Sequence, residues 1–158
     1  MKAQKSKIQN AAYNVGILQG MAYRTLQYHL TAALEPFGIS IPEWKVLGKL
    51  YEKEKLKVVD LALMLAVDPP LITKLVHGLV EKNFLNKIKD TKDQRIVYII
   101  PTKKGLSLIP ETEVAIRKTL GYLLKGVTGE DRAAYKRVLD TIVRQGKLAI
   151  LKKNYLLE

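Results

Sequence analysis

Charged residues gather in one short segment, residues 90–105, which reads DTKDQRIVYIIPTKKG. Lys92 and Arg95 are cations that could bind phosphate, and the planar donor fork of arginine suits the narrow, negative minor groove of A·T-rich DNA. Asp93 would repel phosphate, so we expect its carboxylate to orient Arg95 or to cap the turn. Taken alone, the segment is equally compatible with an ordinary polar hairpin turn.

The net charge favours an anionic partner. The 158 residues include 27 lysines and arginines against 15 acidic residues, for a net charge of +12. A chain this basic is typical of nucleic-acid binding first and of anionic membrane surfaces second. The excess is spread along the chain, however, so a soluble lysine-rich surface is the alternative.

Composition argues against several other functions. The chain has no cysteine, which removes disulfides, thiolate metal ligands and cysteine nucleophiles, and its two histidines are too few for a multi-histidine metal site. It contains no Gly-rich phosphate loop and no nucleophile with a plausible base, so we expect no enzymatic activity, catalytic residue, metal or cofactor. The longest apolar run, residues 61–67, is far short of the roughly 20 residues of a membrane-spanning helix. The polar N-terminus is unlike a signal peptide, and we expect no membrane association and a cytoplasmic location.

Apolar residues recur at helical spacing along most of the chain, and two β-rich runs interrupt them. Ser40 suits the N-cap of the second helix, Asn83 suits the end of the fourth, and Pro110 should bend or interrupt the helix after the hairpin. The predicted elements are helices at 8–37, 40–54, 58–67 and 70–82, a hairpin at 84–101, and helices at 102–126 and 128–153. This order predicts a mainly α fold with a small β-hairpin (α+β), namely a winged helix-turn-helix flanked by long terminal helices.

In a helix-turn-helix, the second helix lies in the major groove and its N-terminal residues reach base edges. Here the candidates on its exposed faces are Pro70, Thr73, Lys74 and, more weakly, His77. The prolines Pro69 and Pro70 delete two backbone donors that could have bound phosphate, so side chains must supply more of that contact. The alternative for these residues is an ordinary solvated helix face.

The hairpin segment also carries a family motif. A D-x-R sequence is followed, after six residues, by Thr, two further residues and Gly; the matching positions are Asp93, Gln94, Arg95, Thr102 and Gly105. Together with the segments around it, over residues 38–108, this motif resembles the multiple antibiotic resistance regulator (MarR) family of transcription factors. Asn83 and Pro101 depart from the usual glycine and leucine.

The resemblance implies a homodimeric, sequence-specific transcriptional regulator, most often a repressor, on a palindromic double-stranded operator. Residues 38–105 would form the DNA-binding domain, and residues 1–37 and 106–158 the helical dimerisation region. In the wing, the DNA-binding candidates are Lys87, Lys92, Gln94 and Arg95, with Asp93 orienting Arg95. The alternative function is a winged-helix module for protein contact or for non-specific DNA binding.

Many family members respond to a small ligand, often an aromatic acid, held between the dimer helices and the reading domain. The corresponding candidates for an effector site are Tyr23, Tyr28, His29, Trp44 and Tyr51. Aromatic residues at helical spacing more often pack in a core, and for Trp44 that interpretation is the stronger one.

Overall fold

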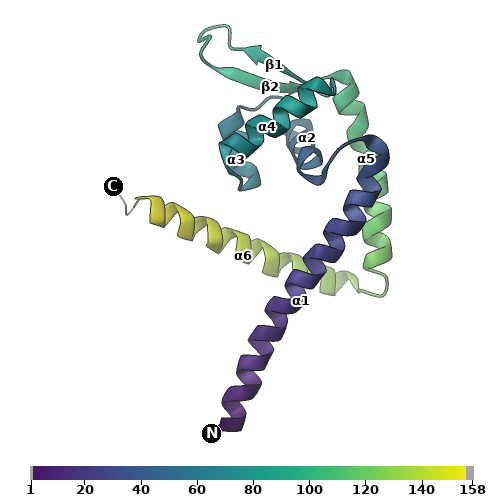
Figure 1. The fold of residues 1–158 in the computed structure, drawn as a ribbon, viewed down its shortest axis with the longest axis vertical. Coiled ribbons are helices and arrows are strands. Elements are labelled where there is room, and N and C mark those ends of the chain that lie inside the picture. Colours follow the sequence, from purple (N-terminus) through teal and green to yellow (C-terminus); the bar gives the residue numbers. More distant parts are fainter. Residues whose placement is uncertain (1, 156–158) are drawn as a thin grey trace. The chain divides into compact units, whose positions relative to one another are not determined.

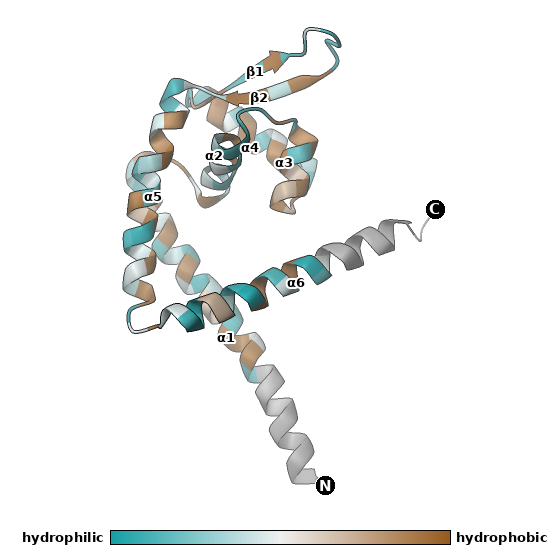
Figure 2. Cartoon of the chain, turned by 180° about the vertical axis from the view of Figure 1, so that it is seen from behind, coloured by the Kyte–Doolittle hydropathy of each residue, from teal (hydrophilic) through white to brown (hydrophobic). Residues whose placement is uncertain are grey.

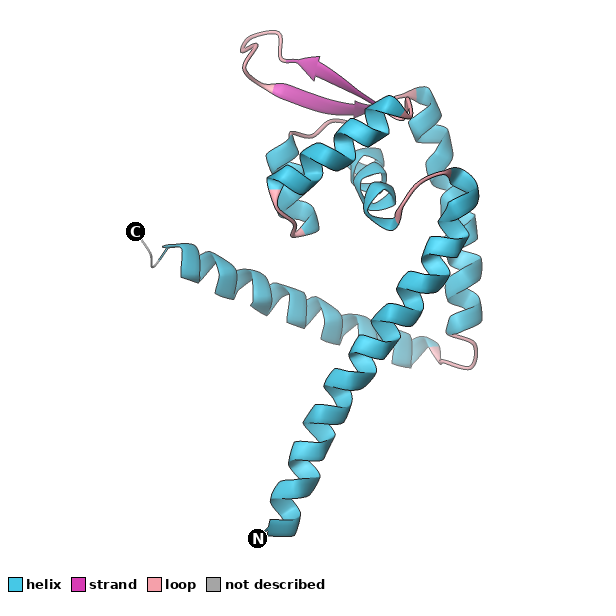
Figure 3. Ribbon diagram, in the orientation of Figure 1, coloured by secondary structure: helices cyan, strands magenta, loops and turns pink. Residues whose placement is uncertain are grey.

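The structure is a computed structural model that describes the backbone of residues 2–155 and the side chains of residues 14–146. Its elements follow the predicted order, and the predicted fold class is confirmed (Figures 1 and 3). They are α1 (Lys2–Leu34), η1 (Glu35–Phe37), α2 (Ile41–Lys53), α3 (Val58–Leu65), α4 (Pro69–Glu81), β1 (Leu85–Lys89), β2 (Val97–Pro101), α5 (Lys103–Leu123) and α6 (Gly129–Tyr155). The chain divides into two compact units, Met1–Thr119 and Leu120–Glu158.

Local signals in the sequence end and begin the first helices. A short 3₁₀ turn containing Pro36 closes α1, and Gly38 adopts a φ of 65° that a side chain would disfavour. Ser40 then caps α2, because its Oγ accepts from the N–H of Glu43 while Glu43 Oε2 accepts from the N–H of Ser40 (2.8 Å). Such a reciprocal capping box satisfies two donors at the helix start.

The two helices of the helix-turn-helix start differently. Before α3, Lys57 has no side-chain acceptor, and its N–H is satisfied instead by Asp60 Oδ2 at 3.3 Å. Before α4, Asp68 accepts from the N–H of Leu71, so α4 begins at Pro69. The end of α4 is the predicted one, because Asn83 takes a left-handed φ of 63°.

The core of the first unit lies among α2, α3, α4 and the hairpin. Its fully buried side chains come from every one of these elements and from the end of α1; they include Leu34, Leu47, Leu50, Leu61, Ile72, Leu79, Leu85 and Ile99. On α4 these residues recur at three- and four-residue steps, so one face packs inward and the opposite face is free.

The hairpin is anchored to the helices by an isolated β-bridge at Leu56. β1 and β2 pair antiparallel from Leu85 opposite Pro101 to Lys89 opposite Val97. On the other edge of β2, Leu56 and Ile99 exchange two backbone hydrogen bonds, at 3.1 and 2.8 Å. Pairing on both edges holds the middle of β2, and the tip of the hairpin extends beyond α4 (Figure 1).

Pro110 does not interrupt α5, contrary to one part of the expectation, since the helix is continuous from Lys103 to Leu123. Proline removes one N–H, which here would have bonded to the carbonyl of Leu106. Buried side chains on both sides of the proline, Leu108, Thr112 and Ile116, hold this stretch against the domain. Packing therefore outweighs the lost hydrogen bond.

The second unit is dominated by α6, which starts at a side-chain cap. Thr128 Oγ1 accepts from the N–H of Asp131 (3.1 Å) and donates to its carboxylate (2.7 Å). Arg132 donates to the carbonyls of Leu124 and Val127 and so closes the preceding turn. None of the helices in the described part of the chain is long and apolar enough to cross a membrane.

Candidate nucleic-acid interface

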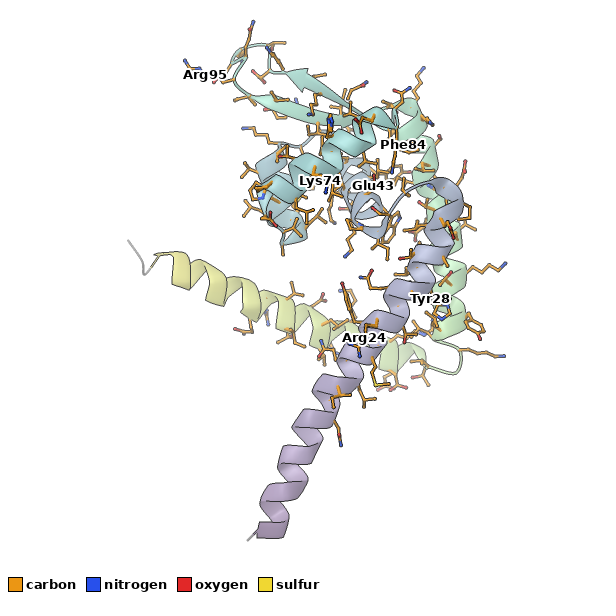
Figure 4. All side chains as sticks on the ribbon, viewed as in Figure 1. Arg24, Tyr28, Glu43, Lys74, Phe84 and Arg95 are labelled. Carbon is orange, nitrogen blue, oxygen red and sulfur yellow. The ribbon has the colours of Figure 1, made fainter. Side chains whose placement is uncertain are left out.

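The predicted reading residues lie together on the free face of α4. Pro70, Thr73, Lys74 and His77 are all exposed, opposite the buried Ile72, Val76 and Leu79. The hydroxyl of Thr73 donates to the carbonyl of Pro69 (3.0 Å), and His77 Nε2 lies 3.3 Å from Glu81 Oε1. Lys74 is therefore the cation that this face presents, and Figure 4 shows it on α4.

The tip of the hairpin is organised by an aspartate that sequence reasoning missed. Asp90 Oδ1 accepts from the backbone N–H groups of Lys92 (2.8 Å) and Asp93 (3.1 Å). These two bonds, with the positive charges of Lys55 and Lys57, hold the pKa of the Asp90 carboxyl below its ordinary value. An aspartate that bonds backbone groups two and three residues ahead is a turn former, so the signal lay in the Asp-Thr-Lys-Asp sequence itself.

Asp93 fixes the backbone that carries Arg95. Its Oδ1 accepts from the N–H of Arg95 (3.0 Å), and its carbonyl accepts from the N–H of Ile96 (2.9 Å). Within residues 14–146, no ion pair joins the carboxylate of Asp93 to the guanidinium of Arg95. Asp93 thus acts on the turn, and the guanidinium extends from the tip (Figure 4).

Further cations flank the wing. Lys87 and Lys92 are exposed, as is Gln94. Beside β2, the ammonium groups of Lys55 and Lys57 lie 4.9 and 5.8 Å from the centre of the Tyr98 ring. The sequence did not predict that Lys55 and Lys57 lie beside the wing, because the β-bridge between Leu56 and Ile99 that places them there is a tertiary contact.

The Thr and Gly of the family motif have a structural role at the junction of α4, β1 and α5. Thr102 Oγ1 lies within donating distance of the carbonyls of Asn83 (2.9 Å) and Phe84 (3.2 Å) and accepts from the N–H of Gly105 (3.0 Å). A Cβ added at Gly105 would overlap the carbonyl oxygen of Phe84 and lie 3.1 Å from its carbonyl carbon. Lys104 covers the Phe84 ring at 4.7 Å. The motif thus clamps the wing to α5.

An ion pair between the nearly buried Glu43 and the exposed Lys82 ties the far end of α4 to α2. Lys82 Nζ donates to Glu43 Oε1 (2.7 Å) and to the carbonyl of Gly38 (2.9 Å). Burial would raise the pKa of the Glu43 carboxyl, but hydrogen bonds from Lys82 and Ser40 outweigh it and hold that pKa below its ordinary value. Glu43 is therefore ionised at neutral pH, and the pair fixes the orientation of α4.

The five predicted effector residues do not all line either of two clefts in the described part of the chain. Trp44 and Tyr51 line a cleft of about 500 Å³ together with Lys45, Lys49, Ile109, Pro110 and Glu113. Tyr28 lines a second cleft, of about 760 Å³, beside the Glu43–Lys82 pair. Tyr23 lines neither, and His29 contacts the Tyr28 ring edge-on at 5.3 Å. The helical spacing of these aromatic residues in the sequence could not predict that they have different surroundings.

Three helices, a reading face and a clamped hairpin define a winged helix-turn-helix protein. Residues 39–97 match the MarR family model. This match confirms the resemblance recognised from the D-x-R motif and the segments around it.

Curated relatives carry names of the same kind. The chain is 27% identical over 96 residues to the uncharacterized HTH-type transcriptional regulator YhbI of Bacillus subtilis, covering 61% of this chain and 62% of that one. It is 27% identical over 132 residues to the HTH-type transcriptional regulator TtmR of Methylorubrum extorquens, covering 84% of this chain. The match spans 62% of the length of TtmR as well.

Solved structures share the fold along most of the chain. A mutant MarR from E. coli complexed with operator DNA has a TM-score of 0.76 and 22% identity, covering 84% of this chain and 96% of that one. CouR from Rhodococcus jostii RHA1, bound to p-coumaroyl-CoA, has a TM-score of 0.74 and 22% identity, covering 81% of this chain and 90% of that one. The likeness extends beyond residues 39–97, so the shared fold includes more than the matched domain.

Proposed function

We propose that the protein is a sequence-specific DNA-binding transcriptional regulator that acts as a homodimer on a palindromic operator. One observation carries the proposal: a free face of α4 and a rigid hairpin tip, both presenting cations, belong to the same winged helix-turn-helix. In this fold the second helix enters the major groove. The wing tip would place Arg95 in the adjacent minor groove, where negative potential attracts arginine.

Roles follow for the interface residues. Lys74 would contact bases or phosphate in the major groove, beside Pro70 and Thr73. Lys87 and Lys92 would neutralise phosphates on either side, and Arg95 would enter the minor groove. Asp90 and Asp93 would hold the turn from within, because their carboxylates are occupied by backbone N–H groups and face no phosphate.

Dimerisation would use residues 1–37 and 106–158. On α1, Val15, Leu18 and Met21 follow one another at three-residue steps and are 63%, 62% and 52% exposed. Figure 2 shows that hydrophobic positions recur along the described part of α1. On α6, Tyr135, Val138 and Ile142 are half exposed at similar steps. Apolar stripes of this kind usually face a partner helix, and a second copy of the chain is the partner we propose.

Release of DNA would be controlled by a small, aromatic effector in the cleft of Trp44 and Tyr51. The cleft offers the aromatic side chains of Trp44 and Tyr51, which suit an aromatic compound, and Lys45 could bind an anionic group on it. Lys49 is paired with Glu52 at 2.8 Å, and Glu113 also lines the cleft. CouR, which shares the fold, is bound to p-coumaroyl-CoA. A ligand there would contact both α2 and α5, and so could move the reading domain relative to the start of α5.

The test is a selection of bound duplexes from a random DNA pool, followed by titration of the selected duplex at several salt concentrations. We expect an enriched palindrome with half-sites about one helical turn, roughly 10 base pairs, apart. Binding should fall steeply with salt, because each phosphate contact releases counterions. An unenriched pool would favour the alternative, a winged-helix module for protein contact or non-specific DNA binding.

A further inference from the structure

The reading end of α4 offers no free backbone donor. Its first two residues, Pro69 and Pro70, have no N–H, and the N–H of Leu71 is taken by Asp68 Oδ2 at 3.3 Å. The next N–H, of Ile72, bonds to the carbonyl of Asp68. A helix start usually offers such groups to phosphate. Here they are missing or occupied, and the Asp68 carboxylate adds a negative charge.

The side chains of the first two turns of α4 are mostly apolar. Pro70 is exposed and Leu71 is 39% exposed. Thr73 is exposed too, but its hydroxyl proton is committed to the Pro69 carbonyl, so it offers outward a methyl group and an accepting oxygen. The first polar donor along this face is Lys74, one turn after Pro70. Apolar side chains therefore occupy the part of α4 with which a reading helix normally contacts base edges.

We propose that this surface of Pro70, Leu71 and Thr73 reads thymine through its 5-methyl group. The inference rests on the proposed function. The thymine methyl is the apolar feature of the major groove, and it contacts apolar side chains, threonine methyls among them. The surrounding charge fits DNA as the occupant: Lys74 follows on the same face, and the wing carries Arg95. Three side chains are also too small a surface for a stable protein interface.

The proposal explains how α4 can be specific without its backbone donors. Each half-site should contain thymine where the first two turns of α4 approach the bases. Discrimination there comes from methyl contact, whereas Lys74 supplies the hydrogen bonds to a neighbouring base or phosphate. Burying one methyl group contributes about 0.8 kcal/mol, so removing it should weaken binding about fourfold.

The experiment replaces each thymine of the selected duplex, one at a time, by deoxyuridine, which lacks only the methyl group. We expect at least one position per half-site at which the substitution weakens binding about fourfold. Thr73→Ser keeps the hydroxyl and removes the protein methyl, and Leu71→Ala shortens the second contact. In one or both variants, the weakening of DNA binding caused by deoxyuridine substitution should fall from about fourfold toward onefold.

Thr141→Ser is the matched control, because Thr141 is an exposed threonine of α6 whose hydroxyl makes the same bond to the carbonyl four residues back (2.9 Å). That variant should keep the full thymine preference. If deoxyuridine is tolerated everywhere while the selected duplex is still preferred over random DNA, the inference is overturned and the proposed function stands. Full thymine preference in both Thr73→Ser and Leu71→Ala would also overturn it. Absence of any sequence preference would overturn the proposed function itself.

Discussion

Replacing Gly105 by alanine should loosen the clamp between the wing and α5. The added methyl group would overlap the carbonyl oxygen of Phe84 and lie 3.1 and 3.4 Å from its carbonyl carbon and Cα. These are backbone atoms, so no side-chain rotation can relieve the overlap. Since C···O contacts in proteins begin near about 3.3 Å, the carbonyl must move by on the order of 1 Å.

The movement has a calculable cost. The carbonyl of Phe84 accepts from the N–H of Thr102 (3.0 Å) and lies 3.2 Å from its hydroxyl. Losing both bonds costs about 1 kcal/mol each, and overpacking a tight site adds about 1–3 kcal/mol. Alanine is the better helix former by about 1 kcal/mol, which offsets part of this. We therefore expect Gly105→Ala to lower the free energy of unfolding by about 2–4 kcal/mol, or Tm by about 5–15 °C.

The assay is urea denaturation followed by circular dichroism, with every variant at the same protomer concentration because dimerisation would shift the midpoint. Gly121→Ala is the matched control: Gly121 lies in the same helix, and a Cβ there meets nothing within 4 Å. That change should leave stability equal or raise it by up to about 1 kcal/mol. If Gly105→Ala unfolds at the same urea concentration as Gly121→Ala, the clamp reasoning is wrong.

Three further predictions concern the ion pair, the reading surface and the effector cleft. Glu43→Gln should lower the free energy of unfolding by about 1.5–3 kcal/mol at pH 7. Because folding lowers the pKa of Glu43, the stability difference between the two proteins should be complete above the ordinary value of about 4.5 and should shrink as pH falls through the folded-state pKa. Denaturation at several pH values measures this difference. Arg95→Ala should weaken binding most on operators with A·T-rich flanks, and Lys74→Ala should relax base choice or weaken binding uniformly; unchanged gel-shift titrations of both would refute the assigned surface. In a thermal-shift screen of aromatic acids, any stabilising compound should lose its effect in Tyr51→Ala and keep it in Tyr23→Ala, since Tyr51 lines the cleft and Tyr23 does not.

Much of the fold was predictable because its signals are local. Ser40 and Thr128 cap their helices through bonds to the residue three positions ahead, and Asn83 ends α4 with a left-handed φ. The two β-rich runs place the hairpin. The D-x-R motif likewise located the wing. Pro110 was overestimated as a helix breaker, because the buried residues around it supply packing that periodicity does not weigh.

The site was less predictable where it depends on contacts across the fold. Gly105 was recognised as a motif residue, but only the structure shows the Phe84 carbonyl that excludes a side chain there. The ammonium groups near Tyr98 reach the wing through the pairing of Leu56 with β2, which has no signature in the sequence. The effector candidates were grouped by residue type, and their separation into different clefts follows from how α1 and α2 pack.

The most direct test of the central claim is the ratio of two dissociation constants, measured at one physiological salt concentration. One is for the duplex selected from the random pool, and the other is for a scrambled duplex of the same length and composition. Specific binders prefer their sites by about 10³-fold or more, and we predict a ratio in that range, with two protomers bound per palindrome. A ratio near one would contradict the account of α4 and the wing as a sequence-reading surface.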